Sequence, residues 1–126
     1  MKKLSTVFLI FSALFVGTKV FAMGFSEALE QTKPVAVLIY ADWADNAQNV
    51  LQAFQTQSQS YGDKYNFVTL NIANKETKDF NAKYHIYPNL PYVLLFKNKG
   101  RINRYLQKDC VLDKSCFTEK LNFFNN

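Results

Sequence analysis

Residues 35–48 read VAVLIYADWADNAQ, and this stretch decides the fold. Its first part, Val35 to Tyr40, is an unbroken apolar run, which is typical of a β-strand buried on both faces. From Asp45 onward the pattern changes to that of an amphipathic helix. The apolar stripe of this helix consists of Ala47, Val50, Leu51 and Phe54. Either Asp42 or Asp45 is suited to cap the helix. The stretch therefore predicts a buried strand followed directly by a helix.

The rest of the chain continues the alternation. A Lys33-Pro34 pair ends a short first helix, because the residue before a proline is pushed out of the helical region. The first helix is expected at 26–32. Three further strands are expected at 67–72, 91–97 and 102–106. Two further helices are expected at 74–83 and 113–124. In the helix 74–83 we expect Phe80 and Ala82 to face inward, and the last helix has the stripe Phe117, Leu121 and Phe124. This order implies a mixed sheet with helices on both faces.

The N-terminus has the pattern of a signal peptide. A basic start, Met1-Lys2-Lys3, precedes an apolar run from Leu4 to Gly17, and Val20-Phe21-Ala22 supplies small residues at a cleavage site. We therefore expect residues 1–22 to be removed and residues 23–126 to form one domain, exported to the bacterial periplasm without a stable membrane anchor. An uncleaved anchor is the alternative, although the run is shorter than the roughly 20 apolar residues of a membrane span.

The charge of the mature domain argues against nucleic-acid binding. The formal net charge of the whole chain is +5, but the predicted signal peptide carries Lys2, Lys3 and Lys19. Its removal leaves 12 basic against 10 acidic residues, and these are scattered along the chain. The segment 97–101, Lys-Asn-Lys-Gly-Arg, is expected to be a charged hairpin turn rather than a phosphate-binding patch.

Four local patterns carry a resemblance to the thioredoxin family. They are the strand 35–40, the segment around Trp43, the segment Lys83-Tyr84-His85-Ile86, and Leu90-Pro91-Tyr92-Val93-Leu94-Leu95-Phe96 with the charged turn that follows. The resemblance covers residues 23–126 apart from the family's extra N-terminal strand. It implies a three-layer α/β/α fold with a mixed central sheet of about four strands.

The chain departs from the family where the family performs its chemistry. Ala44 and Ala47 stand where the two redox cysteines are expected, and a methyl group cannot replace the attacking thiolate. Leu38 stands where the family carries a buried acid that relays protons. The loop 86–91 is one residue longer than usual and contains an additional proline, Pro88. These departures predict a protein that does not use the family's reaction at this segment.

The resemblance also implies a binding groove that needs no thiol. It makes Pro91 the cis-proline of the family, which exposes the backbone of Leu90 beside the Trp43 loop, where an extended peptide can pair with it. Trp43 has two interpretations, packing and binding, and it could form an aromatic lip with Tyr87 and Tyr92. Tyr40 is expected to be mostly core. The predicted peptide-binding residues are Trp43, Ala44, Asp45, Asn46, Ala47, Leu90 and Pro91.

Cys110 and Cys116 are the only two cysteines. In an exported protein such a pair is expected to form a structural disulfide, which would join the end of the last strand to the final helix. A displaced redox pair and two free thiols are the alternatives. The lone His85 has no accompanying ligands for a metal and no nucleophile, so we expect a surface loop histidine, with a place in the groove as the alternative. No metal or cofactor is predicted.

These observations predict a redox-inactive, thioredoxin-like periplasmic protein that binds proteins or peptides as an adaptor, chaperone-like holder or assembly factor. The alternative is a thiol–disulfide oxidoreductase that works through Cys110 and Cys116. A structural subunit of a larger envelope complex is a third possibility. The replacement of both redox cysteines favours a protein that is not an enzyme.

Overall fold

The computed structural model describes residues 24–125, and the predicted signal peptide lies outside them. The described chain forms four strands and five helices: α2 (Phe25–Leu29), β1 (Val35–Tyr40), α3 (Ala47–Tyr61), β2 (Asn66–Asn71), α4 (Glu76–Tyr84), β3 (Tyr92–Lys97), β4 (Ile102–Leu106), α5 (Lys108–Leu112) and α6 (Lys114–Asn125). Every predicted element is present, and no predicted bound differs from the observed one by more than three residues. The helix α5 was not predicted.

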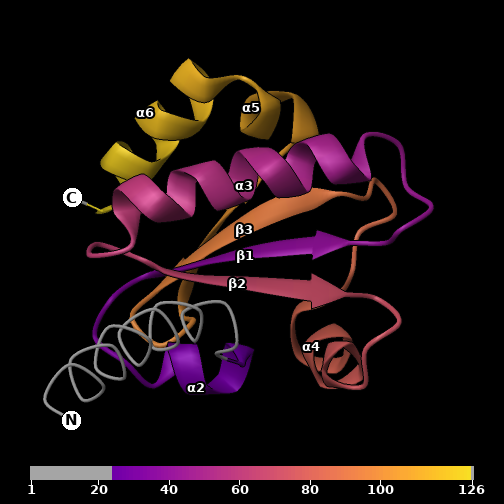
Figure 1. Cartoon of the computed structure of the whole chain (residues 1–126). Helices are drawn as coiled ribbons and strands as arrows, with labels where there is room; N and C mark the ends of the chain where they lie inside the picture. The colour runs from indigo at the N-terminus through magenta and orange to yellow at the C-terminus, as the bar shows by residue number, and fades with distance from the viewer. Residues whose placement is uncertain (1–23, 126) are drawn as a thin grey trace, which may run out of the picture.

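The four strands form one mixed sheet in the order β2-β1-β3-β4. β1 is parallel to β2 and antiparallel to β3, with Ile39 opposite Tyr92, and β3 is antiparallel to β4, with Val93 opposite Leu106. Helices α3, α5 and α6 lie on one face, and α2 and α4 lie on the other (Figure 1). The predicted three-layer α/β/α architecture is therefore confirmed.

Two apolar clusters fill the layers, and β1 contributes alternate side chains to both. Ala36 and Leu38 face α3, α5 and α6, where they join Phe54 and the predicted α6 stripe. Val35, Val37 and Ile39 face α2 and α4, where the core includes Phe25 and Phe80. Because both faces are covered, the whole strand is buried up to Tyr40, as its unbroken apolar run predicts.

Two expectations about the helices are wrong. Neither Asp42 nor Asp45 caps α3: its N-cap is Asn46, which has a left-handed backbone (φ 61°) and makes no side-chain capping bond. Asparagine tolerates this conformation better than most residues. In α4, Ala82 is exposed, because it lies two positions from the buried Phe80 and so on another side of the helix.

Candidate functional site

The principal cavity lies at one edge of the sheet, and the sheet topology determines which segments meet there. Because β1 and β3 are antiparallel, the loop after β1 and the loop before β3 lie at the same edge. Because β3 and β4 are antiparallel too, the chain leaving β4 returns to that edge. These three segments enclose a cavity of about 490 Å³. Its lining consists of Trp43, Ala44, Asp45, Pro88, Asn89, Leu90, Tyr105, Gln107, Lys108 and Asp109.

Four of the seven residues predicted for the groove line this cavity: Trp43, Ala44, Asp45 and Leu90. The remaining three lie close by but not on its wall. Asn46 and Ala47 line a separate hollow of about 320 Å³ at the start of α3, together with Ala44. Pro91 is buried, and the Leu90–Pro91 peptide bond is cis.

The sequence reasoning missed the opposite wall. Gln107, Lys108 and Asp109 belong to the segment that ends β4 and begins α5, and Tyr105 belongs to β4 itself. The signal that could have found them is the β3–β4 hairpin, because a tight turn at 98–100 fixes the register and returns the end of β4 to the Leu90 loop.

Trp43 projects from this site into solvent. Its side chain is 76% exposed, so the packing interpretation of this residue is wrong. Tyr40, by contrast, was expected to be mostly core; it packs against the cluster under α3 and is half-buried. An indole held in the open beside a cavity offers a large apolar face and one N–H donor to a ligand.

A tyrosine cluster extends the cavity. A hollow of about 410 Å³ is lined by Tyr87, Pro88, Asn89, Tyr105 and Gln107, and four of these residues also line the principal cavity. We refer to these two hollows together as the groove. It runs from the exposed Trp43 to Tyr87, which is 44% exposed.

The tyrosines of this cluster have different roles. The rings of Tyr87, Tyr92 and Tyr105 contact one another, with centroid separations of 5.0 to 5.6 Å. Tyr92 is fully buried, so it supports the groove instead of forming its lip, and its hydroxyl accepts a 3.0 Å hydrogen bond from the Tyr87 backbone N–H. Burial raises the pKa of Tyr92 and of Tyr105 above the ordinary tyrosine value. Both hydroxyls therefore stay neutral at physiological pH and can donate hydrogen bonds.

The backbone at Leu90 presents an acceptor. The Leu90 N–H already donates to the Pro88 carbonyl at 3.0 Å. The Leu90 carbonyl accepts no hydrogen bond from a backbone N–H of residues 24–125. An extended peptide could therefore pair with Leu90 by donating to this carbonyl, but the N–H is already occupied. This is half of the pairing that strand addition uses.

The lining of the cavity contains neither a cysteine nor a histidine. Ala44 and Ala47 present methyl groups, and Leu38 is fully buried in the apolar cluster between the sheet and α3. His85 ends α4 in an exposed position with φ 70°, and it does not line the groove. Within residues 24–125 there is no group of three or more His, Cys, Asp or Glu residues that could hold a metal ion. In the same residues no helix has both the length and the apolar character to cross a membrane.

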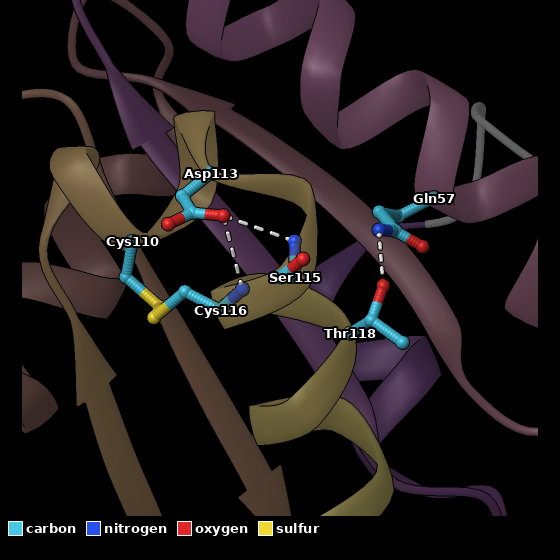
Figure 2. The surroundings of a disulfide bond; sticks show 6 residues. All are labelled: Gln57, Cys110, Asp113, Ser115, Cys116 and Thr118. Carbon is cyan, nitrogen blue, oxygen red and sulfur yellow. Dashed lines mark hydrogen bonds between the residues drawn. A yellow bond between two sulfur atoms is a disulfide. The ribbon is translucent and has the colours of Figure 1, made fainter.

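Cys110 and Cys116 form a disulfide, which confirms the predicted bond (Figure 2). It does not join a strand to a helix as expected: Cys110 lies in α5 and Cys116 in α6. The reason is the additional helix α5, which takes up the chain between β4 and α6. Asp113 connects the two helices, and its carboxylate accepts bonds from the N–H groups of Ser115 (3.0 Å) and Cys116 (3.3 Å).

Comparison with solved structures identifies the fold. The model superposes on an oxidised thioredoxin from Plasmodium falciparum with a TM-score of 0.64 and 18% identity, covering 81% of this chain and 90% of that one. A thioredoxin from Malassezia sympodialis gives a TM-score of 0.63 and 19% identity, over 81% of this chain and 84% of that one. The fold is the thioredoxin fold.

Sequence comparison gives a shorter match. No family model matches the chain. Over 53 residues it is 40% identical to the thioredoxin-like protein HCF164, chloroplastic, of Arabidopsis thaliana, and 38% identical to the protein of the same name from Oryza sativa subsp. japonica. Each match covers 42% of this chain, which spans about a fifth of the length of these curated relatives. The chain therefore has the thioredoxin fold, and 42% of it is similar in sequence to these thioredoxin-like proteins.

Proposed function

We propose that this protein binds unfolded or extended polypeptide in the groove and performs no thiol chemistry at the Trp43 segment. The observation that carries the proposal is the exposed Trp43 indole beside the Leu90 loop, with a methyl group at Ala44 in the same cavity. Trp and Tyr are the residues that contribute most to binding energy at protein interfaces. The groove offers an indole at one end and a tyrosine at the other.

The polar lining of the groove suits a peptide backbone. Asn89 and Gln107 carry amide groups that both donate and accept hydrogen bonds, and the Leu90 carbonyl accepts. The charged side chains, Asp45, Asp109 and Lys108, are of both signs and nearly balance. The groove therefore supports recognition through apolar and backbone contacts more than through charge.

Thiol–disulfide exchange through Cys110 and Cys116 is the alternative function, and one contact disfavours it. A helix N-terminus activates a cysteine by stabilising its thiolate. Here the Asp113 carboxylate already accepts the N–H of Cys116, so this N–H is not free to stabilise a Cys116 thiolate (Figure 2). The pair is therefore better suited to a structural disulfide than to turnover.

We further propose that the protein acts in the bacterial periplasm. The signal-peptide pattern of residues 1–22 supports this, and so does the disulfide, because disulfides persist in oxidising compartments. Cell fractionation followed by intact-mass measurement tests both points. A cytoplasmic protein that retains residues 1–22 would contradict the proposal.

Binding can be measured directly, because Trp43 is the only tryptophan of the chain. The probe is reduced and carboxymethylated ribonuclease A, an unfolded polypeptide that contains no tryptophan. We expect a saturable blue shift of the Trp43 emission with this probe and no shift with native ribonuclease A. An unchanged emission, together with no heat of binding by calorimetry, would contradict peptide binding in the groove.

Insulin reduction in the presence of dithiothreitol separates the two functions. The proposal predicts no acceleration above the blank. Acceleration that disappears in a Cys110→Ser variant would instead establish the oxidoreductase alternative.

A further inference from the structure

Helix α5 is both a wall of the groove and one end of the disulfide. Gln107, Lys108 and Asp109, its N-cap and first two residues, line the cavity opposite Trp43. The next residue along the chain is Cys110, which is bonded to Cys116 in α6 (Figure 2). One covalent bond therefore connects the groove wall to the C-terminal helix.

Helix α5 packs against α3, α6 and β3, but it contributes little of its own to the core. The helix has only five residues, too few to be stable by itself, and its N-cap Gln107 makes no side-chain capping bond. Val111 is the one residue of α5 that is buried in the core. Cys110 itself is half-buried. The disulfide is thus the one covalent link among the contacts that hold this wall.

The other end of the bond is firmly anchored. The α6 stripe of Phe117, Leu121 and Phe124 is buried in the core, and Thr118 of α6 accepts a 3.0 Å hydrogen bond from Gln57 of α3. Asp113 caps the first turn of α6 through its side chain, a contact that does not depend on the disulfide. These anchors of α6 do not depend on the disulfide, whereas α5 loses its covalent link to α6 when the bond breaks.

We propose that the Cys110–Cys116 disulfide clamps the α5 wall of the groove, and that reduction by a dithiol releases this wall and weakens polypeptide binding. In the exchange, a thiolate of the dithiol attacks one cysteine sulfur and releases the other cysteine as a thiol. The second thiol of the reductant then attacks the resulting mixed disulfide and releases the first cysteine. The protein disulfide breaks as a disulfide forms in the reductant, and Cys110 and Cys116 take up two electrons and two protons. The effect on binding rests on the proposed function, whereas the release of α5 does not.

Hydrogen exchange of the oxidised and the dithiothreitol-reduced protein tests the release. Because Cys110 and Cys116 are the only cysteines, the reductant acts at a single site. We expect amide exchange of α5 to accelerate roughly tenfold or more on reduction, while β1, β3 and α6 keep their protection. A Cys110→Ser/Cys116→Ser variant should exchange like the reduced protein and should not respond to dithiothreitol. Unchanged exchange in α5, or equal acceleration in β1 and β3, would overturn the clamp.

A binding measurement then tests the consequence for the groove. The dissociation constant for carboxymethylated ribonuclease A is compared between the two redox states by calorimetry. We expect about fivefold weaker binding after reduction. Equal affinity in the two states would overturn the effect of the clamp and leave the proposed function intact. Absence of binding in the oxidised state would contradict the proposed function, while hydrogen exchange would still decide the release of α5.

Discussion

Leu38 offers the sharpest test of how the base of the site is built. Its side chain is 0% exposed and belongs to the cluster between the sheet and α3, α5 and α6, in which Tyr65 is the only titratable member. In the sheet it lies opposite Thr69 and Val93. A carboxyl introduced by Leu38→Asp would thus be buried without a charged partner, and burial raises the pKa of such a group. Leu38→Asn is the matched control, because asparagine has nearly the same shape as aspartate but carries no charge.

The expected magnitude follows from proton linkage. Both variants lose the packing of a fully buried leucine, which costs about 2–5 kcal/mol. In Leu38→Asp the folded carboxyl keeps its proton to a higher pH than the unfolded one, whose pKa is about 3.9. Stability is therefore present at low pH and falls above pH 4 by about 1.4 kcal/mol for each pH unit, until the pKa of the folded state is reached. Between pH 4 and 7 the extra loss relative to Leu38→Asn reaches roughly 4 kcal/mol.

The measurement is urea unfolding of both variants at several pH values between 4 and 7. Far-UV circular dichroism is the suitable signal, because Trp43 is already exposed in the folded protein and its emission changes little on unfolding. Equal pH dependence of the two variants would show that the position beside Thr69 and Val93 is hydrated, and the reasoning about a dry base beneath the site would be wrong.

Three further predictions address the groove and the core. Trp43→Ala should change the free energy of unfolding by less than about 0.5 kcal/mol but weaken the binding of carboxymethylated ribonuclease A roughly tenfold, as measured by calorimetry. Phe123→Ala, which removes a side chain that is 70% exposed on α6, is the control and should change neither quantity. The double variant Ala44→Cys/Ala47→Cys should reduce insulin measurably but slowly, because Leu38 cannot relay protons as a buried acid would. If neither new thiol had a lowered pKa, the position of Ala44 near the start of α3 would be in doubt. Burial raises the pKa of Tyr65, whose hydroxyl donates to the Leu121 carbonyl, so its contribution is complete below pH 10 and is lost as the pH rises further. Tyr65→Phe should therefore cost about 1 kcal/mol at pH 8 and show a shallower loss above pH 10 in urea titrations; an identical alkaline profile would contradict the assignment.

The strands were predictable because their burial is visible in the residues themselves. β1 is apolar at every position, and the structure covers both of its faces. β4 was predicted at its observed bounds, 102–106, since a turn and an alternating pattern delimit it. Helix α6 shows its stripe at helical spacing, and all three stripe residues are buried. In each case one local pattern was enough.

Helix α5 and the cap of α3 were not predictable in this way. A helix of five residues with one buried side chain, Val111, has no period to detect, and its position depends on contacts with α3, β3 and α6. The choice of Asn46 over two nearby aspartates as the N-cap depends on how the Trp43 loop leaves β1. Consequently the sequence indicated the Trp43 and Leu90 sides of the groove but not the wall that begins at Gln107.

Leu38 and Ala47 stand at positions where the resemblance expects an acid and a cysteine, and both are buried apolar residues. A buried acid at the position of Leu38 would be costly unless its proton were used, and leucine instead joins the packing around Phe54. Ala47 is only 4% exposed, so its methyl group also belongs to the interior, whereas Ala44 is partly open to the cavity. The exposed groups of the site, Trp43 above all, are bound to this apolar base through short loops. The proposed polypeptide binding therefore depends on the exposed side chains of the site, while Leu38 and Ala47 contribute packing.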